Sequence, residues 1–130
     1  MNDYSISSDS AIHVIKGNLI VPVGGSLDED GLRRIGIEIL ELLGKEQIRG
    51  VVINVSAISI LGSYGLSVLQ EIARSITMMG AIPTFAGFQA GVASALVDLD
   101  VDLSGILTAL TTEGAIDMIA QQEVEQKQAK

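Results

Sequence analysis

The chain has 130 residues, which suits one domain, and its 48% hydrophobic content excludes disorder over most of its length. Sixteen acidic against eight basic residues give a net charge of −8, which argues against nucleic acid or an anionic membrane as the main partner. The absence of cysteine excludes disulfides and thiolate metal sites, and the single histidine, His13, argues against a centre built from several histidines.

Two uncharged intervals, 50–70 and 75–97, are long enough to cross a bilayer. Each contains glycine and polar residues, so we interpret each as a strand joined to a helix within a buried α/β sheet. The first ten residues, MNDYSISSDS, lack the basic and apolar regions of a secretory signal. We therefore expect no membrane span and a cytoplasmic protein.

The chain begins with a predicted hairpin. The apolar runs 11–16 and 19–23 flank Gly17 and Asn18, a dipeptide that is typical of a tight turn between strands. Pro22 has no amide hydrogen to donate, so it should lie at a strand end or on an edge.

A helix is predicted next, because apolar residues return every three or four positions between residues 27 and 43. Ser26 or Asp28 is its expected N-cap, and Gly44 is its expected end. Ile37 lies off the apolar stripe of this helix, so we expect its side chain to be exposed.

Strands and helices alternate through the rest of the chain. The expected elements are a buried strand 50–55, a loop 56–62, a helix 63–79, a strand 81–86, a helix 89–99, a strand 106–110 and a helix 112–122. On the helix 63–79, Met78 should point outward. The polar residues 123–130 are expected to fray.

This order predicts an α/β fold. Strands that alternate with helices favour a mostly parallel sheet with right-handed crossovers, and the hairpin makes the sheet mixed. We expect a single domain over residues 1–130, with an ordered core of about residues 11–120. About five strands should carry about four helices packed mainly on one side.

Motifs for catalysis, cofactors and metals are missing from the sequence. It has no phosphate-binding loop, no G-x-S-x-G elbow and no metal-binding histidine pair, so we predict no catalytic residue, cofactor site or metal ligand. Ser63 stands out because it follows a buried strand, at the end of the sheet where α/β folds place functional groups. It is either an ordinary N-cap or a position where a phosphate would lie against a helix N-terminus.

Three stretches resemble the STAS domain, named for sulphate transporters and anti-sigma-factor antagonists. They are LIVPVGGSLDEDGLRRIGIEILELL, GVVINVSAISILGSYGLSVLQ and GAIPTFAGFQAGVASALVDL, and the resemblance covers roughly residues 11–120. The first stretch is most similar to the small, single-domain STAS scaffolds of bacterial stressosomes. The resemblance implies a STAS fold and a non-catalytic regulatory or scaffold role.

The resemblance also implies a site. The phosphorylation motif of the family is Asp-Ser, then an apolar residue or serine, then glycine or an aliphatic residue. Ser63 takes the place of the phosphoacceptor, whereas Gly62 replaces the usual aspartate; Ser59 and Ser56 are weaker candidates. The implied partner-binding surface is the loop and the start of the following helix: Ser59, Gly62, Ser63, Tyr64 and Gly65.

The partners that the resemblance implies are an anti-sigma-type serine/threonine kinase, a cognate phosphatase and a paralogous STAS protein with a sensory N-terminal domain. Assembly would give a homo- or hetero-oligomer, with Ile37 and Met78 as possible contacts because exposed apolar residues often mark a partner. One alternative is an accessory STAS subunit of an ABC lipid-transport complex. Such a subunit would bind an ATPase through the same surface. Another is an enzyme or nucleotide-binding protein, which the absent triad and phosphate loop disfavour.

Overall fold

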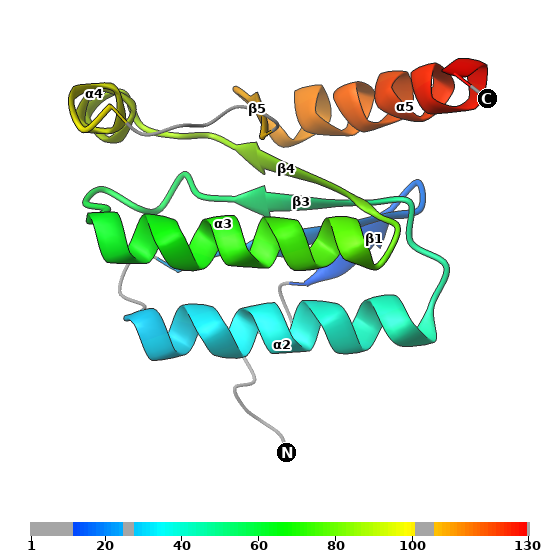
Figure 1. The fold of residues 1–130 in the computed structure, drawn as a ribbon, viewed down its shortest axis with the longest axis horizontal. Helices are drawn as coiled ribbons and strands as arrows, with labels where there is room; N and C mark the ends of the chain where they lie inside the picture. The colour runs from blue at the N-terminus through cyan, green and yellow to red at the C-terminus, as the bar shows by residue number, and fades with distance from the viewer. Residues whose placement is uncertain (1–11, 25–27, 101–105, 130) are drawn as a thin grey trace.

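The computed structural model describes residues 12–24, 28–100 and 106–129, so Ser26, one of the two N-cap candidates, lies outside the described residues. Figure 1 shows the elements in chain order. They are β1 (His13–Ile15), β2 (Asn18–Pro22), α2 (Glu29–Lys45), β3 (Gly50–Asn54), α3 (Ser63–Met78), β4 (Ile82–Ala86), α4 (Ala90–Asp98), β5 (Leu107–Ala109) and α5 (Thr112–Ala129).

All five strands form one sheet in the order β1-β2-β3-β4-β5. β1 runs antiparallel to β2, and the three remaining pairs are parallel. The prediction of a mixed α/β sheet with five strands and four helices is therefore confirmed for the described part of the chain. Pro22 is the last residue of β2, as expected.

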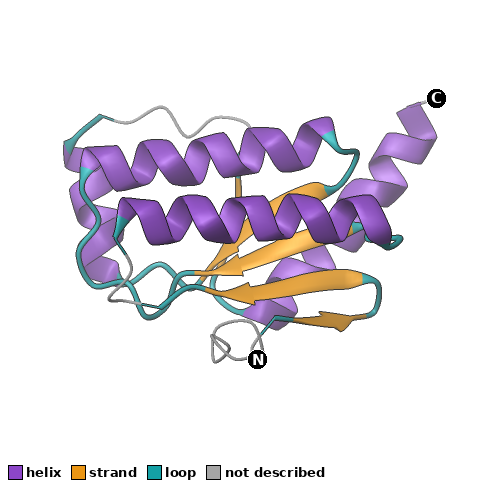
Figure 2. Cartoon of the chain, turned by 90° about the horizontal axis from the view of Figure 1, so that it is seen from below, coloured by secondary structure: helices purple, strands orange, loops and turns teal. Residues whose placement is uncertain are grey.

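Helices cover both faces of the sheet. α2 and α3 lie side by side on one face, and α5 lies on the other (Figures 1 and 2). α2 and α3 follow the expectation that the helices pack mainly on one side, and α5 is the exception. Right-handed crossovers fix the face only for helices that join parallel strands, and α5 follows the last strand. The core beneath α5 consists of Ile20, Val52, Ile82, Ala86, Ala115 and Ile119.

β3 is the central strand and is buried on both faces. Val51 and Ile53 belong to the core under α2 and α3, whereas Val52 belongs to the core under α5, and none of them is more than 1% exposed. At the start of the strand, a Cβ atom on Gly50 would lie 2.7 Å from Cδ1 and Cγ2 of Ile119. The bare backbone of Gly50 therefore lets α5 pack closely against the sheet.

The hairpin turn lies one residue earlier than predicted. Lys16 and Gly17 occupy the turn, both with positive φ (53° and 82°), as a type I′ turn requires. Asn18 begins β2 instead, opposite Ile15, and its buried Nδ2 atom donates to the carbonyl oxygens of Ile15 and Lys16 at 3.3 and 3.4 Å.

The ends of α2 only partly match the prediction. Asp28 is the N-cap, and its Oδ1 atom accepts the amide of Gly31 at 2.8 Å. The predicted end at Gly44 is wrong, because the helix continues to Lys45 and Glu46 is the C-cap. Gly44 is not among the residues with positive φ, so it does not adopt the left-handed conformation that ends many helices.

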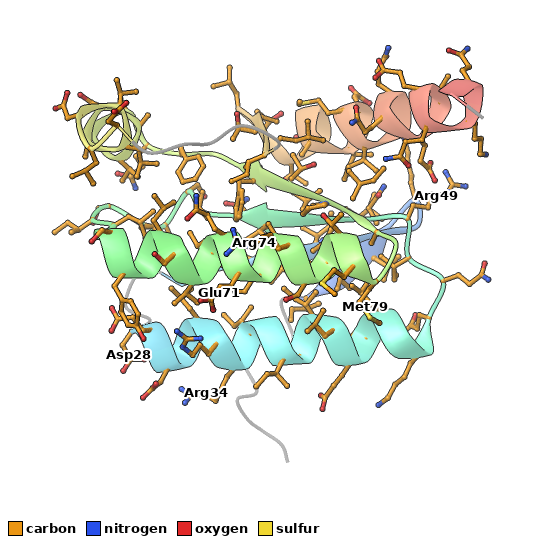
Figure 3. The ribbon with its side chains drawn as sticks, viewed as in Figure 1. Asp28, Arg34, Arg49, Glu71, Arg74 and Met79 are labelled. Atoms are coloured by element: carbon orange, nitrogen blue, oxygen red, sulfur yellow. The ribbon has the colours of Figure 1, made fainter. Side chains whose placement is uncertain are left out.

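The predicted fraying of residues 123–130 is also corrected, because α5 continues to Ala129. Arg49, which precedes β3, lies beside this helix (Figure 3), and its Nη1 atom is 3.6 Å from Oε1 of Glu123. Gln121 donates from Nε2 to Oε2 of Glu125 at 3.4 Å. The segment is therefore helical although its side chains are mostly exposed.

The two uncharged intervals are composite, as expected. Residues 50–70 contain β3 and the first half of α3, and residues 75–97 contain the end of α3, β4 and most of α4. Among the helices in the described ranges, none has the length and apolarity needed to span a membrane.

The glycine positions give a stability test. We expect Gly50→Ala to lower the free energy of unfolding by about 1–3 kcal/mol, because its methyl group would overlap Ile119. Gly44→Ala is the matched control, since a Cβ there meets nothing within 4 Å and alanine favours a helix by up to about 1 kcal/mol. Urea denaturation measures both. A Gly50→Ala protein as stable as the wild type would contradict the close packing of α5.

Candidate functional site

The loop between β3 and α3, residues 55–62, lies at the carboxyl edge of the sheet and is anchored from beneath. Val55 and Ile58 are buried, and Leu61 packs against the same core. Between these anchors, Ser59 is exposed and Ile60 is 88% exposed. The loop is therefore a supported platform that presents its remaining side chains to solvent.

A polar network fixes the start of this loop. Oδ1 of Asn54 accepts from the amide and the hydroxyl of Ser56 at 2.9 and 2.7 Å. Nε2 of Gln89 donates to the carbonyl oxygen of Ser56 at 2.8 Å, and Nδ2 of Asn54 donates to Oγ1 of Thr112 at 3.3 Å. Phosphorylation of Ser56 would first require its hydroxyl to break the hydrogen bond with Asn54. Ser56 is therefore less available as a phosphoacceptor than the exposed Ser59.

Ser63 is the first residue of α3, and the interpretation of Ser63 as N-cap is wrong. Gly62 is the N-cap, with extended backbone (φ −84°, ψ 173°) and a carbonyl oxygen that accepts the amide of Leu66 at 3.0 Å. Ser63 is exposed, and its hydroxyl makes no hydrogen bond to any residue that the structure describes. The carbonyl oxygen of Ser63 accepts from the hydroxyl of Ser67 at 3.1 Å. The Ser63 side chain is thus accessible and carries no capping role.

Two glycines flank this position and differ in the space around them. A Cβ on Gly62 would meet nothing within 4 Å, so position 62 has room for a side chain. A Cβ on Gly65 would lie 3.0 Å from Cδ1 of Leu61, so Gly65 permits the close contact between loop and helix. An aspartate at position 62 would occupy the N-cap, where its carboxylate would accept first-turn amides.

Tyr64 connects the start of α3 to α2 through Arg33. Nη2 of Arg33 donates to the hydroxyl of Tyr64 at 3.1 Å, and the guanidinium carbon lies 5.8 Å from the ring centroid. Nη1 of Arg33 lies 3.1 Å from Oε1 of Glu71, and Figure 3 shows Glu71 between the two helices. The hydrogen bond and charge interaction with Tyr64, and then the contact with Glu71, raise the pKa of Arg33 above its ordinary value.

Sequence reasoning missed this cluster, because Arg33 and Tyr64 are 31 positions apart and meet only where α2 packs on α3. It also missed two exposed apolar side chains at the carboxyl edge. Ile60 lies in the loop after β3, and Leu110, which is 90% exposed, follows β5. Large apolar side chains left in solvent near one edge are typical of a partner surface.

The two possible assembly contacts are exposed, as expected. Ile37, at the middle of α2, is 58% exposed, and Met78, at the end of α3, is 87% exposed. Ile37 lines a groove between α2 and α3, whereas Met78 is not among the residues that line it. The structure therefore gives each an accessible position, on different elements.

Comparison with known proteins identifies similar sequences. A family model described as the STAS domain matches residues 9–115. RsbT co-antagonist protein RsbRA from Bacillus subtilis (strain 168) is 23% identical over 105 residues. The match covers 81% of this chain but 38% of RsbRA, so the chain spans less than half the length of that relative.

Two solved structures have a similar fold. A serine-to-glutamate variant of RsbS from Moorella thermoacetica has a TM-score of 0.73 at 25% identity, and the match covers 86% of this chain and 95% of that one. A chain from a structure of the stressosome, described as a signal integration and transduction hub, has a TM-score of 0.74 at 25% identity, with 86% and 97% covered.

The start of α3 gives a second test of stability. Ser63→Ala should change the free energy of unfolding by less than about 0.5 kcal/mol, because the cap is at position 62. Gly62→Asp should raise it by about 0.5 kcal/mol through a new side-chain cap and a favourable charge at the helix N-terminus. Thermal unfolding checks both. A loss near 1 kcal/mol in Ser63→Ala would restore the capping role to Ser63.

Proposed function

The chain belongs to the STAS domain family, and from that premise we propose that it is a non-catalytic regulator of the anti-sigma-factor antagonist type in a stressosome-like complex. The observation that carries this proposal is the state of Ser63. Its hydroxyl is exposed and uncommitted among the described residues, at the first residue of a helix held by an anchored loop. A regulatory serine needs this combination of access and fixed position.

The proposed partner is an anti-sigma-type serine/threonine kinase that binds unmodified Ser63 together with the exposed apolar side chains Ile60 and Leu110. Phosphorylation would place about −1.5 to −2 charges at this edge. Burying that charge against an apolar contact costs desolvation energy, so the kinase is released. A cognate phosphatase would reset the switch.

The charges around Ser63 favour a phosphate on this residue. The first turn of α3 contains no acidic side chain, and Gly62 leaves the N-terminus of the helix without a carboxylate. The amides of the first turn and the helix dipole therefore remain available to stabilise the phosphate.

Assembly is the second part of the proposal. The partner is a paralogous STAS protein with a sensory N-terminal domain, and Ile37 and Met78 are the proposed contacts, in a homo- or hetero-oligomer in the cytoplasm. RsbRA is longer than the matched region, which suits a protein that carries a further domain beside its STAS domain. A chain of the same fold would act as the scaffold between such subunits.

The phosphorylation site is tested by mapping phosphate with mass spectrometry after incubation with the cognate kinase and ATP. Wild type should carry phosphate on Ser63, and Ser63→Ala should carry none. Ser59→Ala and Ser56→Ala serve as controls and should still be modified. Equal phosphate in wild type and Ser63→Ala would refute the assignment. So would no phosphate in either, if a paralogue with an Asp-Ser motif is modified in the same mixture.

Kinase binding is tested with a phosphate mimic. Ser63→Glu should weaken binding by about tenfold, because it brings only one of the charges of a phosphate to the same helix N-terminus. Gln126→Glu adds the same charge on exposed α5, away from the site, and should leave affinity unchanged. Titration calorimetry with the kinase measures both. Equal affinity for all three proteins would mean that the kinase does not bind at Ser63.

A further inference from the structure

A row of exposed side chains runs along α2 at intervals of four residues. Its members, here called the α2 ridge, are Glu29, Arg33, Ile37, Glu41 and Lys45. Ile37 is the midpoint of the 17-residue helix, and it is 58% exposed. From the start of the helix to its end, the side chains of the ridge are acidic, basic, apolar, acidic and basic. An acidic residue followed by a basic one therefore occurs on each side of Ile37.

When one copy of this series is reversed and placed beside another, each charge lies opposite a charge of the other sign. If a second α2 lies antiparallel to the first with the two Ile37 side chains in contact, Glu29 faces the partner's Lys45 and Arg33 faces the partner's Glu41. A two-fold axis makes each of these pairs occur twice. In a parallel arrangement in the same register, every charge would face its like. The pattern therefore selects one orientation.

We propose that the α2 ridge is a self-association surface and that its occupant is a second copy of this chain, packed antiparallel about a two-fold axis at Ile37. The inference deepens the assembly part of the proposed function and rests on that part alone. It does not involve phosphorylation of Ser63, so the two can fail separately.

The geometry beside the ridge suits this occupant. Rows of side chains four residues apart pack alongside each other when two helices cross at about −50°. A groove of about 230 Å³ lies next to the ridge, between α2 and α3. Its lining residues are Arg33, Gly36, Ile37, Leu40, Val68, Glu71, Ile72 and Ser75. The partner's Ile37 would lie against this mostly aliphatic groove, at whose base the bare backbone of Gly36 lets Ile72 pack closely.

The ridge is also accessible and largely unpaired. Among the described residues, Glu29, Glu41 and Lys45 form no ion pair, and the Arg33 side chain remains 43% exposed beside Glu71. Figures 1 and 3 show α2 on the side of the molecule away from α5, with Arg34 pointing away from the sheet. Pairing of Glu29 with Arg33 and of Glu41 with Lys45 inside the helix would explain the charges but not the exposed Ile37.

The size of the surface sets the strength of the dimer. One helix face with its neighbouring groove belongs among interfaces that bury less than about 1,200 Å², which are weak and transient. Sedimentation equilibrium of the full chain should therefore show a reversible dimer that forms at concentrations of about 10–500 μM.

Charge reversal tests the orientation. Arg33→Glu places a carboxylate opposite the partner's Glu41, and Glu41→Arg places a guanidinium opposite the partner's Arg33, so each variant alone should associate at least about tenfold more weakly. When the two variants are mixed, both cross-pairs become complementary and a heterodimer should form with near wild-type affinity. A local disturbance of the fold would weaken each variant without this rescue.

Control variants distinguish an effect of the ridge on association from an effect of net charge or of exposed apolar surface in general. Glu41→Arg reduces the repulsion between chains of charge −8, so a general charge effect would strengthen association. Glu46→Arg makes the same change at the C-cap, off the ridge, and should not weaken the dimer. Ile37→Glu should abolish it, whereas Val124→Glu, at a position 52% exposed on α5, should not. Circular dichroism verifies that each variant is folded.

Three results would overturn the proposal. They are a wild type that stays monomeric over the whole concentration range, undiminished association of Glu41→Arg, and failure of the mixed variants to form a heterodimer. A wild type that is monomeric alone but binds another protein through the ridge would also overturn the assignment of a second copy. Kinase is absent from these measurements, so their failure leaves the assignment of Ser63 intact.

Discussion

Burial of β3 on both faces is the constraint on which the rest of the fold depends. Its side chains alternate between two cores, so the strand is stable only if helices cover both sides of the sheet. α2 and α3 cover one side, and α5 covers the other by packing Ile119 over the bare backbone of Gly50. The chain must then leave β3 at the carboxyl edge and return through α3. The loop before Ser63 lies at this edge for that reason.

The same packing gives the candidate site its rigidity. A serine that acts as a switch must be accessible to an enzyme yet held in one place, and these requirements conflict in a free loop. Here Ile58 is buried in the core and Leu61 packs against it, while Ser63 faces solvent. Arg33 then links Tyr64, next to Ser63, to α2. Because Arg33 also belongs to the α2 ridge, one side chain is shared by the proposed switch and the proposed assembly surface.

Sequence reasoning was most accurate where periodicity is strong and least accurate at the ends of elements. The exposure of Ile37 followed from its position off the helical stripe. By contrast, the hairpin turn, the end of α2 and the cap of α3 were each displaced by one residue. Local residue preferences are nearly equal at such neighbouring positions. Hydrogen bonds across the sheet and packing between helices decide between them, and a linear pattern does not contain these contacts.

The sequence by itself determined the class of fold, the family and the identity of the candidate serine, because apolar spacing and short motifs are local properties of the chain. Only the tertiary structure decided which face α5 covers, that residues 123–129 remain helical, and that Arg33 meets Tyr64 and Glu71. Each of these depends on residues far apart in the chain. Such contacts exist only in the folded chain, so the physical cause lies in packing rather than in local preference.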